Sequence, residues 1–251
     1  MSNLTIQKKQ VIPPIIHYCW FGRNPLSQSA IRCIESWKKH FPDYEIKEWN
    51  EQNFDVNLCP YTQEAYKRGK YAFVSDVARF WILYQYGGIY FDTDVEVIQS
   101  FEDIVQERAF MGWETADKNG IQYINPGIGI GGAPQNEIFR EILKKFEFLP
   151  FYNEKGEYNS YTMVPLVTDL LIQKGLLQNG KRQNIEGITI YPSEYFCPMN
   201  SLTGKIDLTQ QTHSIHRFTM SWLGGFERFR INIMRVLRRG LYTFGEFILK
   251  R

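Results

Sequence analysis

Residues 86–94 read YGGIYFDTD, in which a glycine pair leads into an apolar run that ends in two aspartates one residue apart. In a strand, side chains two positions apart point to the same face, so we expect the carboxylates of Asp92 and Asp94 to converge at one strand end. Carboxylates so close repel each other unless a positive charge lies between them, and oxygen ligands suit a hard divalent cation that also binds phosphate. The spacing predicts a metal site and a phosphorylated substrate, with a solvated loop as the alternative.

The residues before this stretch indicate a helix. Apolar side chains recur at helical spacing there, at Phe73, Val77, Phe80, Trp81 and Tyr84. We expect a helix from Ser75, as its N-cap, to Tyr86, and we expect Gly87-Gly88 to turn the chain into the strand. Asp76 and Arg79 lie three residues apart on one helical face. They form either a simple intrahelical ion pair or part of the same site as the two aspartates.

Residues 70–94 resemble the family 32 glycosyltransferases, whose sugar-binding region contains a DXD motif, and are more distantly similar to the glucosylating domains of large clostridial toxins. Further blocks follow the family in order: IIHYCWFG at 15–22, WKKHFPDYE at 37–45 with Trp49-Asn50, NPGIG at 125–129 and IHRFTMSW at 215–222. Together the blocks cover roughly residues 12–224. The resemblance implies a GT-A fold, a nucleotide-sugar donor, a divalent cation and retention of anomeric configuration.

The resemblance also implies a metal-binding set. Asp92 and Asp94 would hold Mn²⁺ or Mg²⁺ at the donor's diphosphate. His216 matches a late family position near the metal, and a neutral imidazole can bind a transition metal. The alternative for His216 is a buried core histidine, and His213 lies only three residues away. Two further residues match positions that contact the diphosphate in the family's relatives, namely Ser221 and Trp222.

Other matches imply contacts with the rest of the donor. Trp20 matches a residue that stacks on the nucleobase, although a tryptophan after a strand can equally be core. Asp76 and Arg79 match residues that hydrogen-bond the sugar hydroxyls, a task that suits a fixed acceptor and donor. Tyr90 is expected on the same strand face as Asp92. Asn125 is expected to face the reacting centre, although the family more often has Asn-Thr-Gly where this chain has Asn-Pro-Gly.

Composition favours one large α/β domain. The chain has 251 residues, 43% of them hydrophobic, which is enough for a substantial core. A net charge of +2 argues against a nucleic-acid-binding protein. The four cysteines show no metal-ligand spacing and suit buried thiols in a reducing compartment. The polar N-terminus and the lack of a long apolar run predict a cytoplasmic protein.

Strand and helix patterns alternate along the chain. We expect strands at 11–21, 44–49, 89–94, 109–113, 128–131 and 188–192, and helices at 27–40, 62–67, 75–86, 136–149 and 165–174. Alternation of this kind predicts an α/β fold with a Rossmann-like, mostly parallel sheet flanked by helices, here of GT-A type. We expect this glycosyltransferase domain to span residues 1–225.

The last segment, 226–251, has a different composition, with seven arginines and lysines against two glutamates. Apolar residues recur every three or four positions from Phe226 to Ile248, and Arg228, Arg235 and Arg239 fall opposite them. This pattern is typical of a basic amphipathic helix in a membrane interface, with a packed terminal helix as the alternative. We therefore expect a C-terminal helical tail in peripheral contact with the inner face of the cytoplasmic membrane.

These observations predict a metal-dependent, retaining glycosyltransferase. It would move a hexose, with galactose or glucose favoured, from a UDP-sugar to a glycan acceptor. We expect that acceptor to be a lipid-linked oligosaccharide in surface-polysaccharide synthesis. Alternatives on the same fold are a mannosyl- or N-acetylhexosaminyltransferase. More remote alternatives are a non-catalytic sugar-nucleotide-binding module and a metal-dependent phosphodiesterase or nucleotidyltransferase. Those last enzymes usually surround two metals with more ligands than this chain offers.

Overall fold

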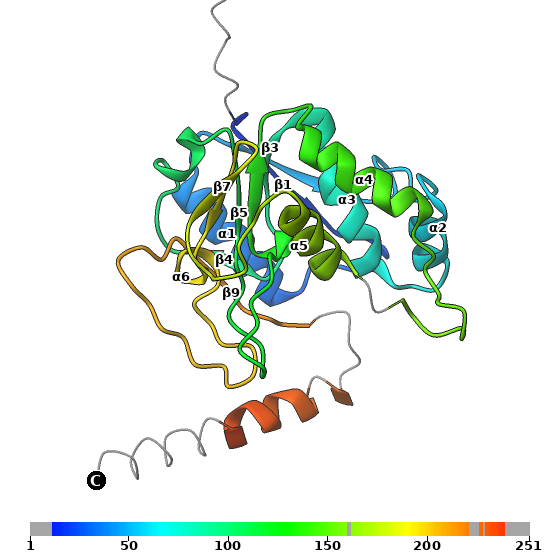
Figure 1. The fold of residues 1–251 in the computed structure, drawn as a ribbon. Coiled ribbons are helices and arrows are strands. Elements are labelled where there is room, and N and C mark those ends of the chain that lie inside the picture. The colour runs from blue at the N-terminus through cyan, green and yellow to red at the C-terminus, as the bar shows by residue number, and fades with distance from the viewer. Residues whose placement is uncertain (1–11, 160–161, 221–225, 228, 239–251) are drawn as a thin grey trace, which may run out of the picture.

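The computed structural model describes residues 12–159, 162–220, 226–227 and 229–238 (Figure 1). Within them a seven-stranded sheet has the order β2-β1-β3-β6-β5-β8-β7. Five strands run in one direction: β1 (Ile15–Cys19), β2 (Glu45–Trp49), β3 (Gly88–Tyr90), β5 (Ala109–Gly112) and β8 (Ile188–Tyr191). Two run against them: β6 (Ile130–Gly132) and β7 (Gln183–Ile185). The predicted α/β fold with a mostly parallel sheet is confirmed.

Helices cover both faces of the sheet, as Figure 1 shows. One face packs against α2 (Pro60–Lys67), α3 (Tyr71–Tyr86), α4 (Glu137–Phe148) and α5 (Met163–Gln173). The other packs against α1 (Gln28–His40) and the short α6 (Ser193–Phe196). Residues along β3 and just after it alternate between the two cores: Ile89 and Phe91 face α1, whereas Tyr90 faces α3. Burial on both faces explains the largely apolar sequences of the inner strands β3, β5 and β8, whereas the edge strands β2 and β7 are more polar.

Two predicted helix starts are confirmed by their capping contacts. Ser27 accepts a hydrogen bond from the Ala30 backbone N–H before α1. Asn136 accepts from two backbone N–H groups at the start of α4. Each side chain satisfies an amide that the first helical turn leaves unpaired. Local polar residues therefore fix where these helices begin.

The predicted start of α3 is wrong. Ser75 is not an N-cap but lies inside the helix, where its hydroxyl donates to the Tyr71 carbonyl at 3.2 Å. The helix begins one turn earlier because Val74 is fully buried against the sheet, so tertiary packing extends it beyond the capping signal. The predicted glycine turn at the other end is present: a Cβ on Gly88 would lie 2.6 Å from the Ile15 carbonyl oxygen.

The two aspartates do not lie in a strand. After β3 the chain makes a tight turn in which Val95 N–H donates to the Asp92 carbonyl at 3.0 Å, and β4 (Val95–Val97) follows. This strand pairs antiparallel with β9 (Ser214–His216), which places His216 opposite Val95. The turn, not the two-residue period of a strand, brings Asp92 and Asp94 together. The sequence pattern predicted neither of the three-residue strands β4 and β9.

Smaller differences concern other segments. The predicted strand at 128–131 is a 3-10 turn, η2 (Pro126–Ile128), followed by β6. A second 3-10 turn, η1 (Ile104–Gln106), and strand β7 were not predicted. All four cysteines are free and buried, as predicted.

The described part of the tail, 226–227 and 229–238, is helical. Arg228 and residues 239–251 lie outside the described residues. Among the residues described, no helix is both long and apolar enough to cross a lipid bilayer. The boundary between domain and tail at residue 225 stays a prediction.

Candidate active site

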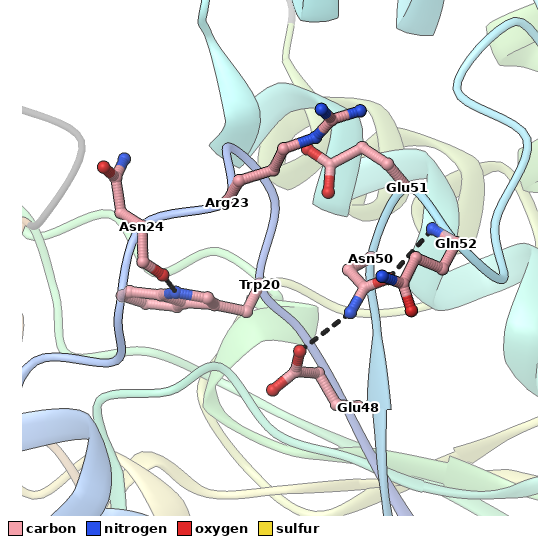
Figure 2. A pocket seen from close by; sticks show the side chains of 7 residues that line it. All are labelled: Trp20, Arg23, Asn24, Glu48, Asn50, Glu51 and Gln52. Carbon is pink, nitrogen blue, oxygen red and sulfur yellow. Dashed lines mark hydrogen bonds between the residues drawn. The ribbon is translucent and has the colours of Figure 1, made fainter.

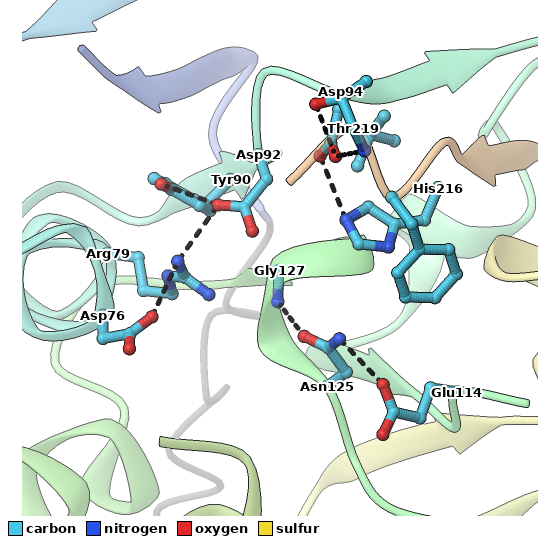
Figure 3. A network of polar contacts seen from close by, with 12 residues as sticks. Asp76, Arg79, Tyr90, Asp92, Asp94, Glu114, Asn125, Gly127, His216 and Thr219 are labelled. Atoms are coloured by element: carbon cyan, nitrogen blue, oxygen red, sulfur yellow. Dashed lines mark hydrogen bonds and ion pairs between the residues drawn. The ribbon is translucent and has the colours of Figure 1, made fainter. Parts of the chain in front are cut away.

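Three predicted metal ligands lie together at the carboxyl edge of the sheet (Figure 3). One ligand atom from each of Asp92, Asp94 and His216 lies within 4.8 Å of the others. Asp94 Oδ1 is 3.0 Å from His216 Nε2, and its Oδ2 accepts from the Thr219 backbone N–H at 2.8 Å and hydroxyl at 3.1 Å. Two carboxylates and one imidazole are a donor set that fits Mn²⁺ and, less closely, Mg²⁺.

The charges in this cluster are poorly balanced. Burial opposes ionisation of Asp94, but His216 and the hydrogen bonds from His216 and Thr219 outweigh it and lower its pKa to about 2. Burial also opposes charging of His216, yet Asp94 raises the pKa of His216 well above its usual value. Burial raises the pKa of Asp92; Arg79 opposes this effect and Asp94 adds to it. A divalent cation would compensate both carboxylates at once.

The predicted sugar contacts form a chain of charges beside the metal ligands. Arg79 is buried, and its Nη2 lies 3.1 Å from Asp76 Oδ1 and 3.0 Å from Asp92 Oδ1. Tyr90 donates its hydroxyl to the same Asp92 oxygen at 3.1 Å. Burial raises the pKa of Asp76 to about 6, with Arg79 opposing and Asp92 adding. The intrahelical ion pair therefore exists, and it extends to the DXD turn.

Asn125 is held on both sides of its amide. Its Oδ1 accepts from the Gly127 backbone N–H at 2.8 Å, and its Nδ2 donates to Glu114 Oε2 at 3.1 Å (Figure 3). Burial raises the pKa of Glu114, while the hydrogen bond from Asn125 opposes this. Glu114 was not predicted from the sequence. A single glutamate after a strand carries no motif, and only the folded chain brings it to Asn125.

A cavity of about 560 Å³ opens beside Trp20, which follows β1 (Figure 2). The indole Nε1–H donates to the Asn24 carbonyl at 2.6 Å, which fixes the ring. Because β1, β2 and β3 are parallel, their carboxyl ends meet at one sheet edge, which also carries Asp92. The cavity is strongly polar and is lined, besides Trp20, by Arg23, Asn24, Glu48, Asn50, Glu51 and Gln52.

The two late histidines have different surroundings, and Ser221 and Trp222 complete the set of predicted residues. His213 is structural, because its Nδ1 lies 2.5 Å from the Ser100 carbonyl and its ring stacks on Tyr195. The ring of His216 instead packs against Phe218 beside Asp94. Ser221 and Trp222 lie outside the described residues.

Comparisons with known proteins concern the family of the chain. Residues 27–111 match the family model described as "Glycosyltransferase sugar-binding region containing DXD motif". This match confirms the family resemblance and identifies the segment as a sugar-binding region of DXD type.

Relatives with curated names are also glycosyltransferases. Over 104 residues, 40% of this chain, it is 31% identical to inositol phosphoceramide mannosyltransferase 3 of Schizosaccharomyces pombe, but that match spans only 29% of the yeast protein. It is 27% identical over 205 residues to an uncharacterized glycosyltransferase of Acanthamoeba polyphaga mimivirus, covering 78% of this chain and 76% of the viral one. Among solved structures, the PaToxG glycosyltransferase aligns with 66% of this chain and 71% of its own at 18% identity, with a TM-score of 0.48.

Proposed function

We propose that this protein is a metal-dependent glycosyltransferase that moves a hexose from a nucleotide sugar to a glycan acceptor. The observation that carries the proposal is the convergence of Asp92, Asp94 and His216 within 4.8 Å. This cluster lies at the same sheet edge as the cavity beside Trp20. A cation there and a flat aromatic ring nearby match the two ends of a nucleoside diphosphate.

Different side chains would bind different parts of the nucleotide-sugar donor. Asp92, Asp94 and His216 would hold Mn²⁺ or Mg²⁺, which stabilises negative charge on the departing diphosphate as a Lewis acid. Trp20 offers a fixed ring face on which a nucleobase stacks. Asp76 would offer an acceptor to sugar hydroxyls, whereas Arg79, which was predicted to contact the sugar, is buried and holds Asp76 in place. Arg79 also pairs with the Asp92 carboxylate, so its single guanidinium connects the proposed sugar site to the proposed metal site.

We propose retention of anomeric configuration by displacement at one face. The acceptor oxygen forms its bond to the anomeric carbon as the bond from that carbon to the phosphate oxygen breaks, and the acceptor's proton passes to the phosphate. A double displacement would need a free carboxylate as nucleophile. Asp76 is paired with Arg79 and Glu114 holds Asn125, which supports the single-face route.

The favoured donors are UDP-galactose and UDP-glucose. The mannosyltransferase name of the fission yeast relative makes a mannosyl donor the second candidate. The phosphodiesterase alternative is weaker, because the cluster contains one imidazole and two carboxylates, enough for a single cation.

The test is a screen of UDP-galactose, UDP-glucose and GDP-mannose for Mn²⁺-dependent release of nucleoside diphosphate. We expect one of them to be consumed, and we expect Asp94→Asn to abolish release without unfolding the protein. Asp43→Asn is the matched control, because Asp43 is exposed just before β2, at the amino-terminal ends of the parallel strands and away from the site. Trp20→Ala should weaken UDP binding by about 1–3 kcal/mol and leave Mn²⁺ affinity unchanged. Equal release by wild type and Asp94→Asn would refute the proposal.

We further propose a lipid-linked oligosaccharide acceptor and peripheral attachment to the inner face of the cytoplasmic membrane. The described tail helix leaves six large apolar side chains exposed, namely Phe226, Phe229, Ile233, Met234, Val236 and Leu237. A helix packed on the domain would bury such residues, so their exposure favours membrane contact.

One tail arginine has a different role from the one predicted. Arg235 does not face outward; its guanidinium donates to the carbonyls of Ser201, at 2.9 Å, and Phe218, at 3.3 Å. This contact ties the helix to the domain just after β9.

Flotation with anionic liposomes tests the attachment. Full-length protein should float at low salt and release at high salt, since each arginine near an anionic surface contributes about 1 kcal/mol. Phe229→Ser with Leu237→Ser should abolish flotation. Leu177→Ser, an equally exposed leucine outside the tail, should not. Full-length protein that stays in the soluble fraction at low salt would refute membrane attachment.

A further inference from the structure

Asp92 is supported from the side opposite to Arg79 by the turn at 125–128. Its backbone N–H donates to the Gly127 carbonyl at 3.1 Å. Its Oδ2 lies so close to Gly127 that a Cβ there would be 2.1 Å away. Figure 3 shows Gly127 between the Asp92 carboxylate and the Asn125 amide. The position of this metal ligand therefore depends on the position of the turn.

The position of the turn at 125–128 depends on Asn125 and Glu114. Asn125 Oδ1 caps η2 by accepting the Gly127 N–H at 2.8 Å. Its Nδ2 donates to Glu114 Oε2 at 3.1 Å. A carboxylate only accepts hydrogen bonds, so Glu114 permits one orientation of the amide, with Oδ1 toward the turn. Glu114 thereby fixes the cap and the cap fixes Gly127.

We propose that Glu114 is a positioning residue that, through Asn125 and Gly127, sets the carboxylate of Asp92 for metal binding. The inference rests on the proposed metal site and assigns Asn125 a different role from direct contact with the donor. Both polar atoms of its amide are already bonded within the protein. Partners behind a metal ligand orient it and commonly matter nearly as much as the ligand itself.

Exchanging the two side-chain types tests the pair, with Mn²⁺ affinity of the donor-free protein and turnover as readouts. Asn125→Asp places two carboxylates in contact, and we expect Mn²⁺ affinity to fall by about 10–100-fold. Glu114→Gln should have little effect, because the new amide can still accept from Asn125. The double variant should recover wild-type affinity: the Gln amide donates to the new Asp, whose other oxygen still caps Gly127, and the total charge is unchanged.

A matched control exists in the exposed turn between α4 and α5. There Asn153 Oδ1 accepts from backbone N–H groups, and its Nδ2 donates to Glu157 Oε2 at 3.1 Å. Asn153→Asp should leave Mn²⁺ affinity unchanged. If Asn125→Asp does not fold, Glu114→Ala replaces it, with a loss of Mn²⁺ affinity expected because the amide loses its partner.

The outcomes separate this inference from the proposed function. A loss of Mn²⁺ affinity in Asn125→Asp that is recovered in the double variant supports the positioning role of Glu114. Unchanged affinity in Asn125→Asp, or no recovery in the double variant, overturns it, since a residue that contacts the donor directly would not regain its role from Glu114→Gln. Wild-type protein that binds no Mn²⁺ overturns the proposed function and this inference together.

Discussion

Gly127→Ala should disable the site through a single methyl group. The glycine lies in η2 with a backbone conformation that alanine tolerates, so the new Cβ is the main perturbation. It would lie 2.1 Å from Asp92 Oδ2 and 3.1 Å from Asn125 Oδ1. Because the backbone is tied to Asn125 and Asp92 by hydrogen bonds, we expect the carboxylate to give way.

The displacement can be worked out from these distances. Asp92 Oδ2 must move by roughly 0.9 Å to reach even 3.0 Å, the shortest contact a Cβ normally makes. Its partner oxygen would then leave the hydrogen bonds from Arg79 and Tyr90. A misplacement of about 1 Å can cost about 100-fold in rate, which corresponds to about 2.7 kcal/mol.

The assay is Mn²⁺-dependent release of nucleoside diphosphate, with Mn²⁺ affinity measured on the same protein. Gly131→Ala serves as control, because its Cβ would lie 2.4 Å from a ring carbon of the core residue Phe110. We expect that variant to lose stability while its folded fraction keeps wild-type Mn²⁺ affinity. A folded Gly127→Ala protein with unchanged Mn²⁺ affinity and turnover would refute the reasoning.

Two further predictions concern the charges. Arg79→Ala should lower the free energy of unfolding by about 2 kcal/mol, because it removes the cation that pairs with two half-buried carboxylates, Asp76 and Asp92. Urea denaturation measures this loss, and a loss equal to that of Asp76→Asn would contradict the prediction. Mn²⁺ affinity should rise with pH by about tenfold per unit up to the pKa of His216, because the ion must displace the proton that Asp94 helps His216 to hold. The stability of the metal-free protein should change with pH in the opposite direction. The His216–Asp94 pair stabilises the fold at low pH, where His216 is protonated, and this stabilisation is lost as the pH rises through the raised pKa of His216. Titration between pH 6 and 8 tests the affinity, and a flat profile would contradict this role of His216.

Much of the site follows from short-range sequence. Asp76 and Arg79 share a helical face because they lie three apart, and the glycine pair sends the chain directly from that helix to Asp92. Tyr90 was expected on the side of Asp92, and its hydroxyl reaches that carboxylate. All these contacts lie within a few turns of one helix and the strand after it, so periodicity and turn chemistry are enough to predict them.

Two local expectations failed for physical reasons. Ser75 matched a capping residue, but burial of Val74 extended the helix past it. Asp92 and Asp94 were expected on one face of a strand, but a turn ends the strand at Tyr90. The carboxylates still converge, because a tight turn brings residues two apart together as effectively as a strand does.

The sequence by itself determined the α/β class, where α1 and α4 begin, and the charged segment from Asp76 to Asp94, since each depends on patterns of residues a few positions apart. Only the tertiary structure decided which histidine joins the cluster and what holds Asn125. Glu114 lies 11 residues from Asn125 and meets it beside the isolated antiparallel bridge that joins Trp113 to Ile124 after β5. His216 reaches Asp94 because β9 pairs with β4, more than a hundred residues away along the chain. Pairing between such distant segments depends on the packing of the whole core, which no local pattern encodes.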